Sequence, residues 1–138
     1  MLYSFLRKEE RNVVAVLNRS PAALDKGQVL TKATLKAAER LGLSQKVLSN
    51  VIGLSESVVS RMKSGDYVLD GGKAYELAAL FVRLYRSLDA IVAGDETAAR
   101  AWMKSDNLAL RGTPIELIQK IPGLFHVVQY LDTRRAPV

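Results

Sequence analysis

The residues best suited to chemistry in this 138-residue chain are basic ones, concentrated between Lys26 and Lys63. This window holds seven Lys or Arg residues and two acidic ones, so it contributes +5 to the chain's net charge of +6. The seven bases are Lys26, Lys32, Lys36, Arg40, Lys46, Arg61 and Lys63. A cluster of positive charge is typical of a surface that binds a polyanion such as a nucleic acid. Charge alone would also fit an ordinary solvated helical surface.

Catalytic chemistry has little support in the sequence. The chain has no cysteine, which excludes disulfides, thiolate metal sites and cysteine nucleophiles. Its single histidine, His126, excludes a histidine-cluster metal site and makes a Ser-His-Asp enzyme a poor candidate. No phosphate-binding loop or dinucleotide-binding glycine pattern occurs. We therefore expect a protein that is not an enzyme and needs no metal or cofactor.

The composition and patterning favour a soluble, all-α protein. Apolar residues make up 49% of the chain, enough for a substantial core, and strand signals are nearly absent. No apolar run approaches the roughly 20 residues that span a bilayer. The first residues, MLYSFLRKEER, place their charges after a short apolar run, the reverse of a signal peptide. We expect a cytoplasmic protein with no membrane partner.

The stretch LSQKVLSNVIGLSESVVSRMKSG, residues 43–65, predicts the two short helices that would position part of the basic window. Ser44 can cap a helix over about 45–52, and Ser55 can cap a second over about 56–64. Gly53 supplies the positive φ that a tight turn between them needs, while Ser49 is small enough for a close crossing. Five apolar residues fall on the inner faces: Leu48, Ile52, Leu54, Val59 and Met62. This is the pattern of a helix-turn-helix, with a plain helical hairpin as the alternative.

The second of these helices would present short polar side chains and one arginine. Arg61 can form a bidentate fork with guanine edges, and Gln45 stands at a helix N-terminus where a phosphate can approach. The predicted DNA contacts are Gln45, Lys46, Ser55, Glu56, Ser57, Ser60, Arg61 and Lys63.

Before this motif, the sequence predicts a helix over residues 2–19 that ends at Ser20-Pro21. Residues 22–30 read as a loop with Gly27 as its turn. Thr31 then reads as the N-cap of a helix that reaches Leu41.

After it, Asp70-Gly71-Gly72 is the strongest break in the chain. A long helix is predicted over 73–92, with an apolar stripe and a second apolar flank at Leu80 and Tyr85. Three shorter helices are expected to follow. The first covers 96–104, and the second begins at Thr113, which forms a capping box with Glu116. The third covers 124–133, after a break at Pro122-Gly123. The stripe of the long helix consists of Leu77, Phe81, Leu84, Leu88 and Ile91.

These breaks divide the chain into four parts. They are an N-terminal helical segment (1–25), a helix-turn-helix domain (26–70), a long connecting helix (71–94) and a small helical C-terminal domain (95–138).

Two segments resemble known families. LSQ..L...IGLS...VSR...G in residues 43–65 resembles the Xre-type helix-turn-helix of lambdoid repressors, with Ser49 where alanine is usual and Met62 where tryptophan is common. AWMKSDNLALRGTPIELI followed by LFHVVQYLDTR resembles the toxin-binding domain of Xre/MbcA/ParS antitoxins. The residues that match this second motif are Trp102, Asn107, Leu110, Gly112, Thr113, Pro114, Glu116 and Leu117. In this order, over about residues 30–133, the two parts resemble the Xre antitoxin of RES–Xre toxin–antitoxin systems.

This resemblance implies a type II antitoxin with two jobs. The C-terminal domain would block the active site of a cognate RES-type, NAD-consuming toxin, and the helix-turn-helix would bind operator DNA as a homodimer and repress the operon. The alternative is a stand-alone transcriptional regulator whose C-terminal half only dimerises.

The matched motif residues read mainly as scaffold. Trp102 is expected in the core, Asn107 and Gly112 in a turn, and Thr113 with Glu116 in a helix cap. The outward positions are better candidates for the toxin contact: Arg111, Ile115, Gln119, Phe125, Gln129, Arg134 and Arg135. Val128 and Leu131 are expected to anchor the last helix on the toxin together with Phe125.

Overall fold

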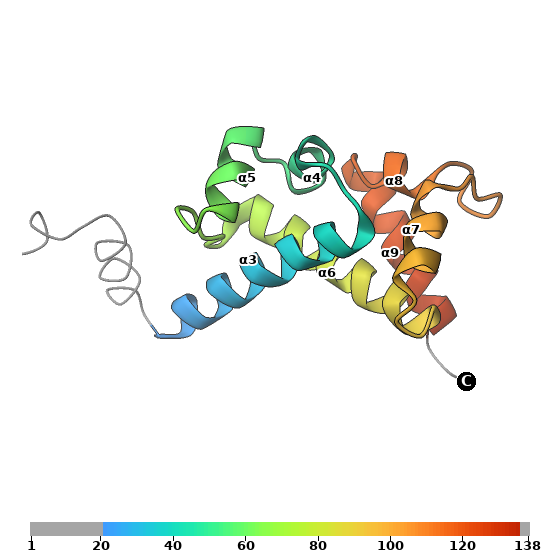
Figure 1. Cartoon of the computed structure of the whole chain (residues 1–138), viewed down its shortest axis with the longest axis horizontal. Coiled ribbons are helices and arrows are strands. Elements are labelled where there is room, and N and C mark those ends of the chain that lie inside the picture. Colours follow the sequence, from blue (N-terminus) through green and yellow to red (C-terminus); the bar gives the residue numbers. More distant parts are fainter. Residues whose placement is uncertain (1–20, 136–138) are drawn as a thin grey trace, which may run out of the picture.

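The computed structural model describes residues 21–135, and all structural statements refer to this range. It contains seven helices and no strand within that range, which confirms the all-α prediction (Figure 1). The helices are α3 (Pro21–Leu41), α4 (Gln45–Ile52), α5 (Glu56–Lys63), α6 (Gly72–Ile91), α7 (Glu96–Lys104), α8 (Pro114–Leu117) and α9 (Ile121–Arg135). The helix expected over residues 2–19 lies outside the described residues.

The loop expected over residues 22–30 is wrong, because α3 runs through it without a break. Gly27 is buried where α3 crosses the segment before α6, and a Cβ on it would lie 2.5 Å from the Leu69 carbonyl oxygen. Thr31 is not an N-cap. Its hydroxyl donates to the Gly27 carbonyl (2.8 Å) and accepts from the Leu69 N–H (2.9 Å). Tertiary packing therefore outweighs the low helix propensity of glycine.

The capping box predicted at Thr113 does not form. Thr113 is the N-cap and Pro114 opens α8, but the Thr113 side chain makes no cap hydrogen bond. The N–H of Glu116 donates instead to the Thr113 carbonyl, at 3.0 Å, as in a tight i→i+3 turn. As a result α8 is a single turn.

Pro122 and Gly123 do not precede the last helix as predicted but form part of its first turn. Proline is tolerated there because the N–H groups of a first turn have no helical partner. Gly123 is required by packing, since a Cβ on it would lie 2.0 Å from the Leu117 carbonyl oxygen. The ends of α8 and α9 therefore approach more closely than any residue with a side chain would allow.

Helix α6 is the centre of the molecule. It packs against α3 and α4 on one side and against α9 on another, so it runs from one group of helices to the other (Figure 1). The predicted stripe is buried at Leu77, Phe81, Leu84 and Leu88, but Ile91 is exposed. One continuous core joins α4 and α5 to α7 and α9 through this helix. This core is therefore continuous across the parts that the sequence divides at residues 70 and 94.

Two polar contacts also join the groups. Arg100 of α7 donates from Nε to the Arg40 carbonyl and from Nη2 to the Glu39 carbonyl, both at 2.9 Å. It thereby satisfies carbonyl groups at the C-terminal end of α3, where Gly42 takes a left-handed conformation (φ 71°). Asn50 of α4 donates from Nδ2 to Oε1 of Gln119 at 2.9 Å.

Candidate DNA-binding and toxin-binding surfaces

Helices α4 and α5 form a helix-turn-helix with the predicted geometry. Ser44 accepts a hydrogen bond from the Val47 N–H (3.1 Å) and Ser55 accepts one from the Val58 N–H (3.2 Å). Gly53 is left-handed (φ 71°), as the turn requires. The expected small residue, Ser49, is buried between the helices. The inner residues Leu48, Ile52, Val59 and Met62 are buried, and Leu54 is half-buried.

The outward face of α5 is polar and accessible. Glu56, Ser57, Ser60 and Lys63 are exposed, as are Lys46 of α4 and the cap residue Ser55. Arg61 is also exposed, and its guanidinium lies 5.6 Å from the centroid of the Tyr67 ring. This cation–π contact can hold the arginine in place before it meets a ligand.

Gln45 is placed differently from the other DNA-contact candidates. Its Nε2 donates to the Glu56 carbonyl at 3.0 Å, and its Oε1 accepts from Lys63 Nζ at 3.3 Å. The side chain therefore ties the start of α4 to α5. It shares this end of the motif with Lys63, so both can still lie beside a phosphate.

The predicted C-terminal contacts do not form one cluster. Phe125 and Gln129 lie one turn apart on α9 and are exposed. Ile115 of α8 and Gln119, in the turn after it, are half-buried, and Gln119 bonds to Asn50. Arg111 lies in the loop before α8.

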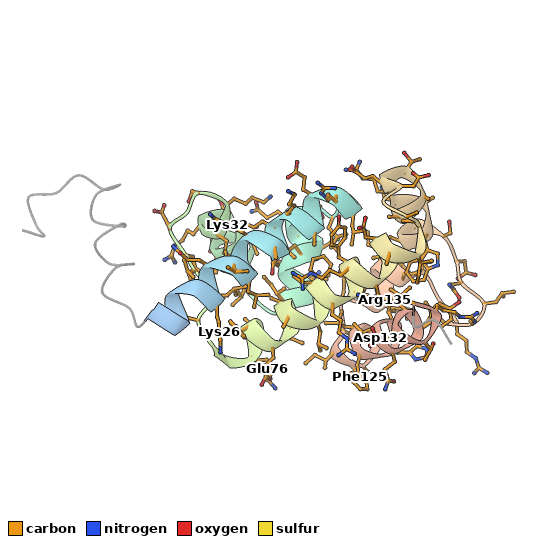
Figure 2. The ribbon with its side chains drawn as sticks, turned by 90° about the horizontal axis from the view of Figure 1, so that it is seen from below. Lys26, Lys32, Glu76, Phe125, Asp132 and Arg135 are labelled. Carbon is orange, nitrogen blue, oxygen red and sulfur yellow. The ribbon has the colours of Figure 1, made fainter. Side chains whose placement is uncertain are left out.

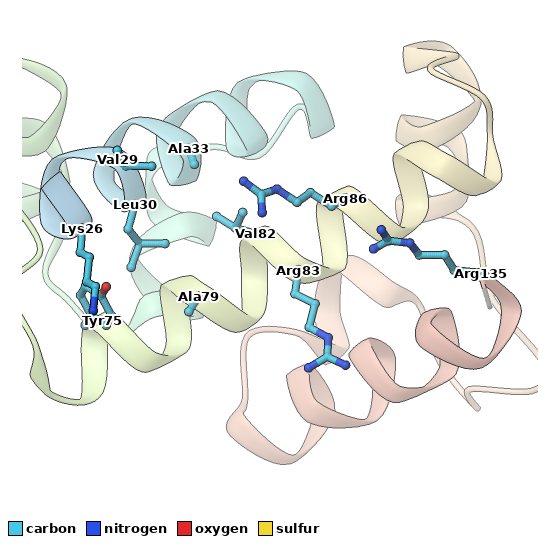
Figure 3. Close-up of a pocket in the computed structure, with 10 residues that line it drawn as sticks. All are labelled: Lys26, Val29, Leu30, Ala33, Tyr75, Ala79, Val82, Arg83, Arg86 and Arg135. Atoms are coloured by element: carbon cyan, nitrogen blue, oxygen red, sulfur yellow. The ribbon is translucent and has the colours of Figure 1, made fainter.

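The two terminal arginines bind to neighbouring side chains rather than standing free. Arg134 lies 4.9 Å from the centroid of the Tyr130 ring, and Arg135 donates to the Ser87 hydroxyl at 3.3 Å. Figure 2 shows Phe125, Asp132 and Arg135 spread along α9. Arg135, the last residue of α9, extends toward α6 and lines a groove of about 500 Å³ between α3 and α6 (Figure 3). The groove also contains Arg83, which pairs with Asp132 at 2.5 Å.

Two protein-family models match consecutive parts of the chain. Residues 20–83 match the antitoxin Xre-like helix-turn-helix domain, and residues 87–136 match the antitoxin Xre/MbcA/ParS C-terminal toxin-binding domain. The chain has both domains of an Xre-type antitoxin. These are the domains of a type II antitoxin that binds DNA, and the short gap between the two matched ranges, residues 84–86, lies inside α6. No curated protein matches the chain.

Two kinds of site are absent from the described residues of the antitoxin, a metal-ion cluster and a membrane-spanning helix. No group of three or more His, Cys, Asp or Glu side chains is placed there to hold a metal ion. None of the helices in residues 21–135 is long and apolar enough to cross a membrane.

Two of the three residues predicted to anchor the toxin are buried within the toxin-binding domain. Val128 and Leu131 are only 2% and 1% exposed, because they face α6 in the antitoxin's own core, and so cannot anchor a toxin. Phe125 is 51% exposed, and Ile121, one turn earlier, is 53% exposed. Ile121 was missed by the sequence reasoning, although its spacing of four from Phe125 places both on one helical face.

Trp102 is half-buried rather than fully buried. Its ring stacks on Tyr130 with 6.4 Å between centroids and 17° between planes, and Arg134 lies against the same tyrosine. The tryptophan thus helps to fix α7 on α9, as its predicted scaffold role requires. Asn107 also serves its predicted turn, accepting a hydrogen bond at Oδ1 from the Leu110 N–H at 3.1 Å.

Proposed function

We propose that this antitoxin blocks the active site of a RES-type, NAD-consuming toxin and represses its own operon by binding operator DNA as a homodimer. The choice of a RES-type partner rests on the resemblance of the two domains, in this order, to RES–Xre antitoxins. The observation that carries the toxin-binding half is the distribution of exposed apolar side chains.

Five large apolar side chains are exposed in the described residues: Val29, Ile91, Leu108, Ile121 and Phe125. Four of them lie within residues 87–136, the range of the toxin-binding domain. Exposed apolar surface of this kind is typical of a site that binds another protein. Ile121 and Phe125 share a face of α9, and we infer that they are the apolar anchor of the toxin contact.

The terminal arginines supply the chemistry for blocking the toxin. A site that consumes NAD⁺ must accept a pyrophosphate and carries catalytic groups that a cation can engage. Arg134 and Arg135 are exposed at the end of α9, beyond the apolar pair. In this proposal Ile121 and Phe125 hold the helix on the toxin, and the arginines exchange their present contacts with Tyr130 and Ser87 for groups at the mouth of the pocket.

The DNA-binding half of the proposal rests on the polar surface of α5. Its exposed serines, Ser57 and Ser60, are short, so the helix can approach base edges closely while Arg61 reaches further. One recognition helix buries too little surface for tight, specific binding. Two copies reading two half-sites would meet that need.

The experiment measures NAD⁺ consumption by the purified toxin, titrated with antitoxin variants. Phe125→Ala should weaken inhibition about 30-fold or more, because truncating a buried aromatic anchor often costs about 2 kcal/mol. Val29→Ala is the matched control, since it removes an exposed apolar side chain outside the toxin-binding domain. Thermal melting should show both variants folded. Equal inhibition by Phe125→Ala and wild type would show that this face of α9 is not the anchor. If the wild type itself fails to inhibit the toxin, the blocking function is wrong.

A further inference from the structure

The loop from Asn107 to Gly112, here called the 107–112 loop, is a closed and well-supported structure. The N–H of Asn107 donates to the Gly112 carbonyl at 3.0 Å, and the N–H of Gly112 donates to the Asn107 carbonyl at 3.3 Å. Within it, the Arg111 N–H donates to the Leu108 carbonyl at 3.3 Å. Backbone bonds therefore fix both ends and the tip of the loop.

Two residues attach this loop to the domain. Leu110 is buried in the core, only 3% exposed, and the Asn107 carboxamide accepts a bond from its N–H. Gly112 packs against Leu117, whose Cδ2 would lie 3.2 Å from a Cβ added to the glycine. The loop is thus held to α8 by apolar burial and close contact.

Two features of the loop are unfavourable for the isolated antitoxin. Leu108 is 93% exposed, more than any other large apolar side chain among the described residues. Arg111 has a positive φ of 58°, a conformation that side chains other than glycine adopt at a cost. The second such residue in the described range, Ala93, lies in the turn that ends α6. Arg111 is not at a helix end, so no helix termination explains its conformation.

Exposed apolar surface and backbone strain both concentrate where proteins bind their partners. Next to the loop lies a depression of about 430 Å³ between the loop, α8 and the start of α9. Arg111 and Lys120 line it, with Glu116 as its one acidic side chain. A partner that covers this region should therefore combine an apolar recess with acidic groups.

We propose that the 107–112 loop is a second toxin contact, in which Leu108 enters an apolar recess of the toxin and Arg111 pairs with a carboxylate at its rim. This inference rests on the proposed toxin-binding function and goes beyond it by assigning Leu108, which no sequence motif marks. The hydrogen bond from the Arg111 N–H to the Leu108 carbonyl holds these two residues at the same tip of the loop. The loop needs no rearrangement to bind, so little conformational entropy is lost.

The test measures toxin affinity and melting temperature for three variants of the full chain. Leu108→Asp should weaken toxin binding about tenfold or more, as expected for an apolar anchor, and should leave the melting temperature unchanged because the side chain touches little. Val29→Asp is the matched control, because it places the same new charge on an exposed apolar side chain outside the toxin-binding domain, and it should bind toxin within about twofold of wild type. Arg111→Gly should raise the melting temperature by relieving strain and yet weaken toxin binding.

Three results would overturn the proposal. They are wild-type affinity in Leu108→Asp, an equal loss in Leu108→Asp and Val29→Asp, and an altered oligomeric state of Leu108→Asp with toxin binding intact. A wild-type antitoxin that does not bind the toxin at all would instead refute the proposed function, whatever the variants do.

Discussion

The DNA-binding face and the toxin-binding domain expose opposite kinds of side chain. On α5 the exposed residues are polar or charged, whereas Val59 and Met62 are buried and Val58 is half-buried. In residues 87–136, Ile91, Leu108, Ile121 and Phe125 are left in solvent. DNA is read through hydrogen bonds and charge, whereas a protein partner can supply the missing half of an apolar core. The contrast suggests that one small core supports two surfaces with different physical requirements.

The largest expected effect tests whether the two surfaces can be separated at all. A fragment ending at Gly94 lacks α7–α9, so it should lose toxin neutralisation. It also uncovers the face of α6 that α9 buries, including Leu84 and Leu88, and removes the Arg100 contacts to the end of α3. Exposing two fully buried leucines costs several kcal/mol, at about 1.5–3 kcal/mol each. We therefore expect the fragment to lose operator binding as well.

Gel filtration, circular dichroism and operator binding of the fragment check this expectation. A monodisperse, helical fragment that binds the operator as tightly as the full chain would show that the helix-turn-helix is an independent domain.

A smaller effect should separate the surfaces without disturbing the core. Changing Ser57, Ser60 and Arg61 together to alanine should abolish specific operator binding and leave toxin inhibition intact, because all three side chains are exposed. Arg61→Ala alone should cost about 1–3 kcal/mol and relax the base preference at one position if the arginine reads a guanine. Gel shifts on the native operator and on single-base variants measure both effects.

Lys46→Ala is the control for the arginine. It should weaken binding to all sequences alike and lower the salt dependence by about one counterion, as loss of a phosphate contact does. A triple variant that is folded but no longer inhibits the toxin would show that the toxin also binds the α5 surface.

The smallest effect concerns the contact that joins the two groups of helices. Arg100→Ala removes two hydrogen bonds to carbonyls at the end of α3 and should lower the free energy of unfolding by about 1–2 kcal/mol. Glu96→Ala removes only the exposed ion pair with Arg100 (2.9 Å), which is worth about 0.5 kcal/mol or less. Urea denaturation distinguishes the two variants. Equal free energies of unfolding for the two variants would show that the hydrogen bonds from Arg100 to α3 do not stabilise the fold.

The sequence predicted those elements that local chemistry determines. Gly42, Gly53 and Gly65 are left-handed where helices were expected to end, and Ser44 and Ser55 accept the expected cap hydrogen bonds. These features depend on residues within one turn of each other, so a linear pattern contains them. The helix-turn-helix is built almost entirely from such features, and its elements were predicted within one residue.

The predictions that failed concern local structure and exposure that are determined by residues distant in the sequence. Gly27 is helical because Leu69, 42 positions later, lies against it and bonds to Thr31. The exposed face of α9 could not be identified from the sequence, because the helix has apolar residues on all its faces. Packing on α6 determines that Val128 and Leu131 are buried while Ile121 and Phe125 are exposed. The exposure of Leu108 depends in the same way on a loop held by contacts to α8. The exposed surface of the C-terminal domain was therefore less predictable than the helices of the helix-turn-helix.

Because α6 belongs to the core on both sides, the described residues hold the two surfaces in one packed unit. A toxin bound to the C-terminal domain would then keep a fixed direction relative to a DNA groove that receives α5. For two copies bound to one duplex, the mutual orientation of their toxins would then be set by the helical phase of the two half-sites, which repeats about every 10.5 base pairs. Inserting about five base pairs between the half-sites would rotate one toxin to the opposite side of the duplex. The length of DNA between half-sites would thus determine the shape of the assembly.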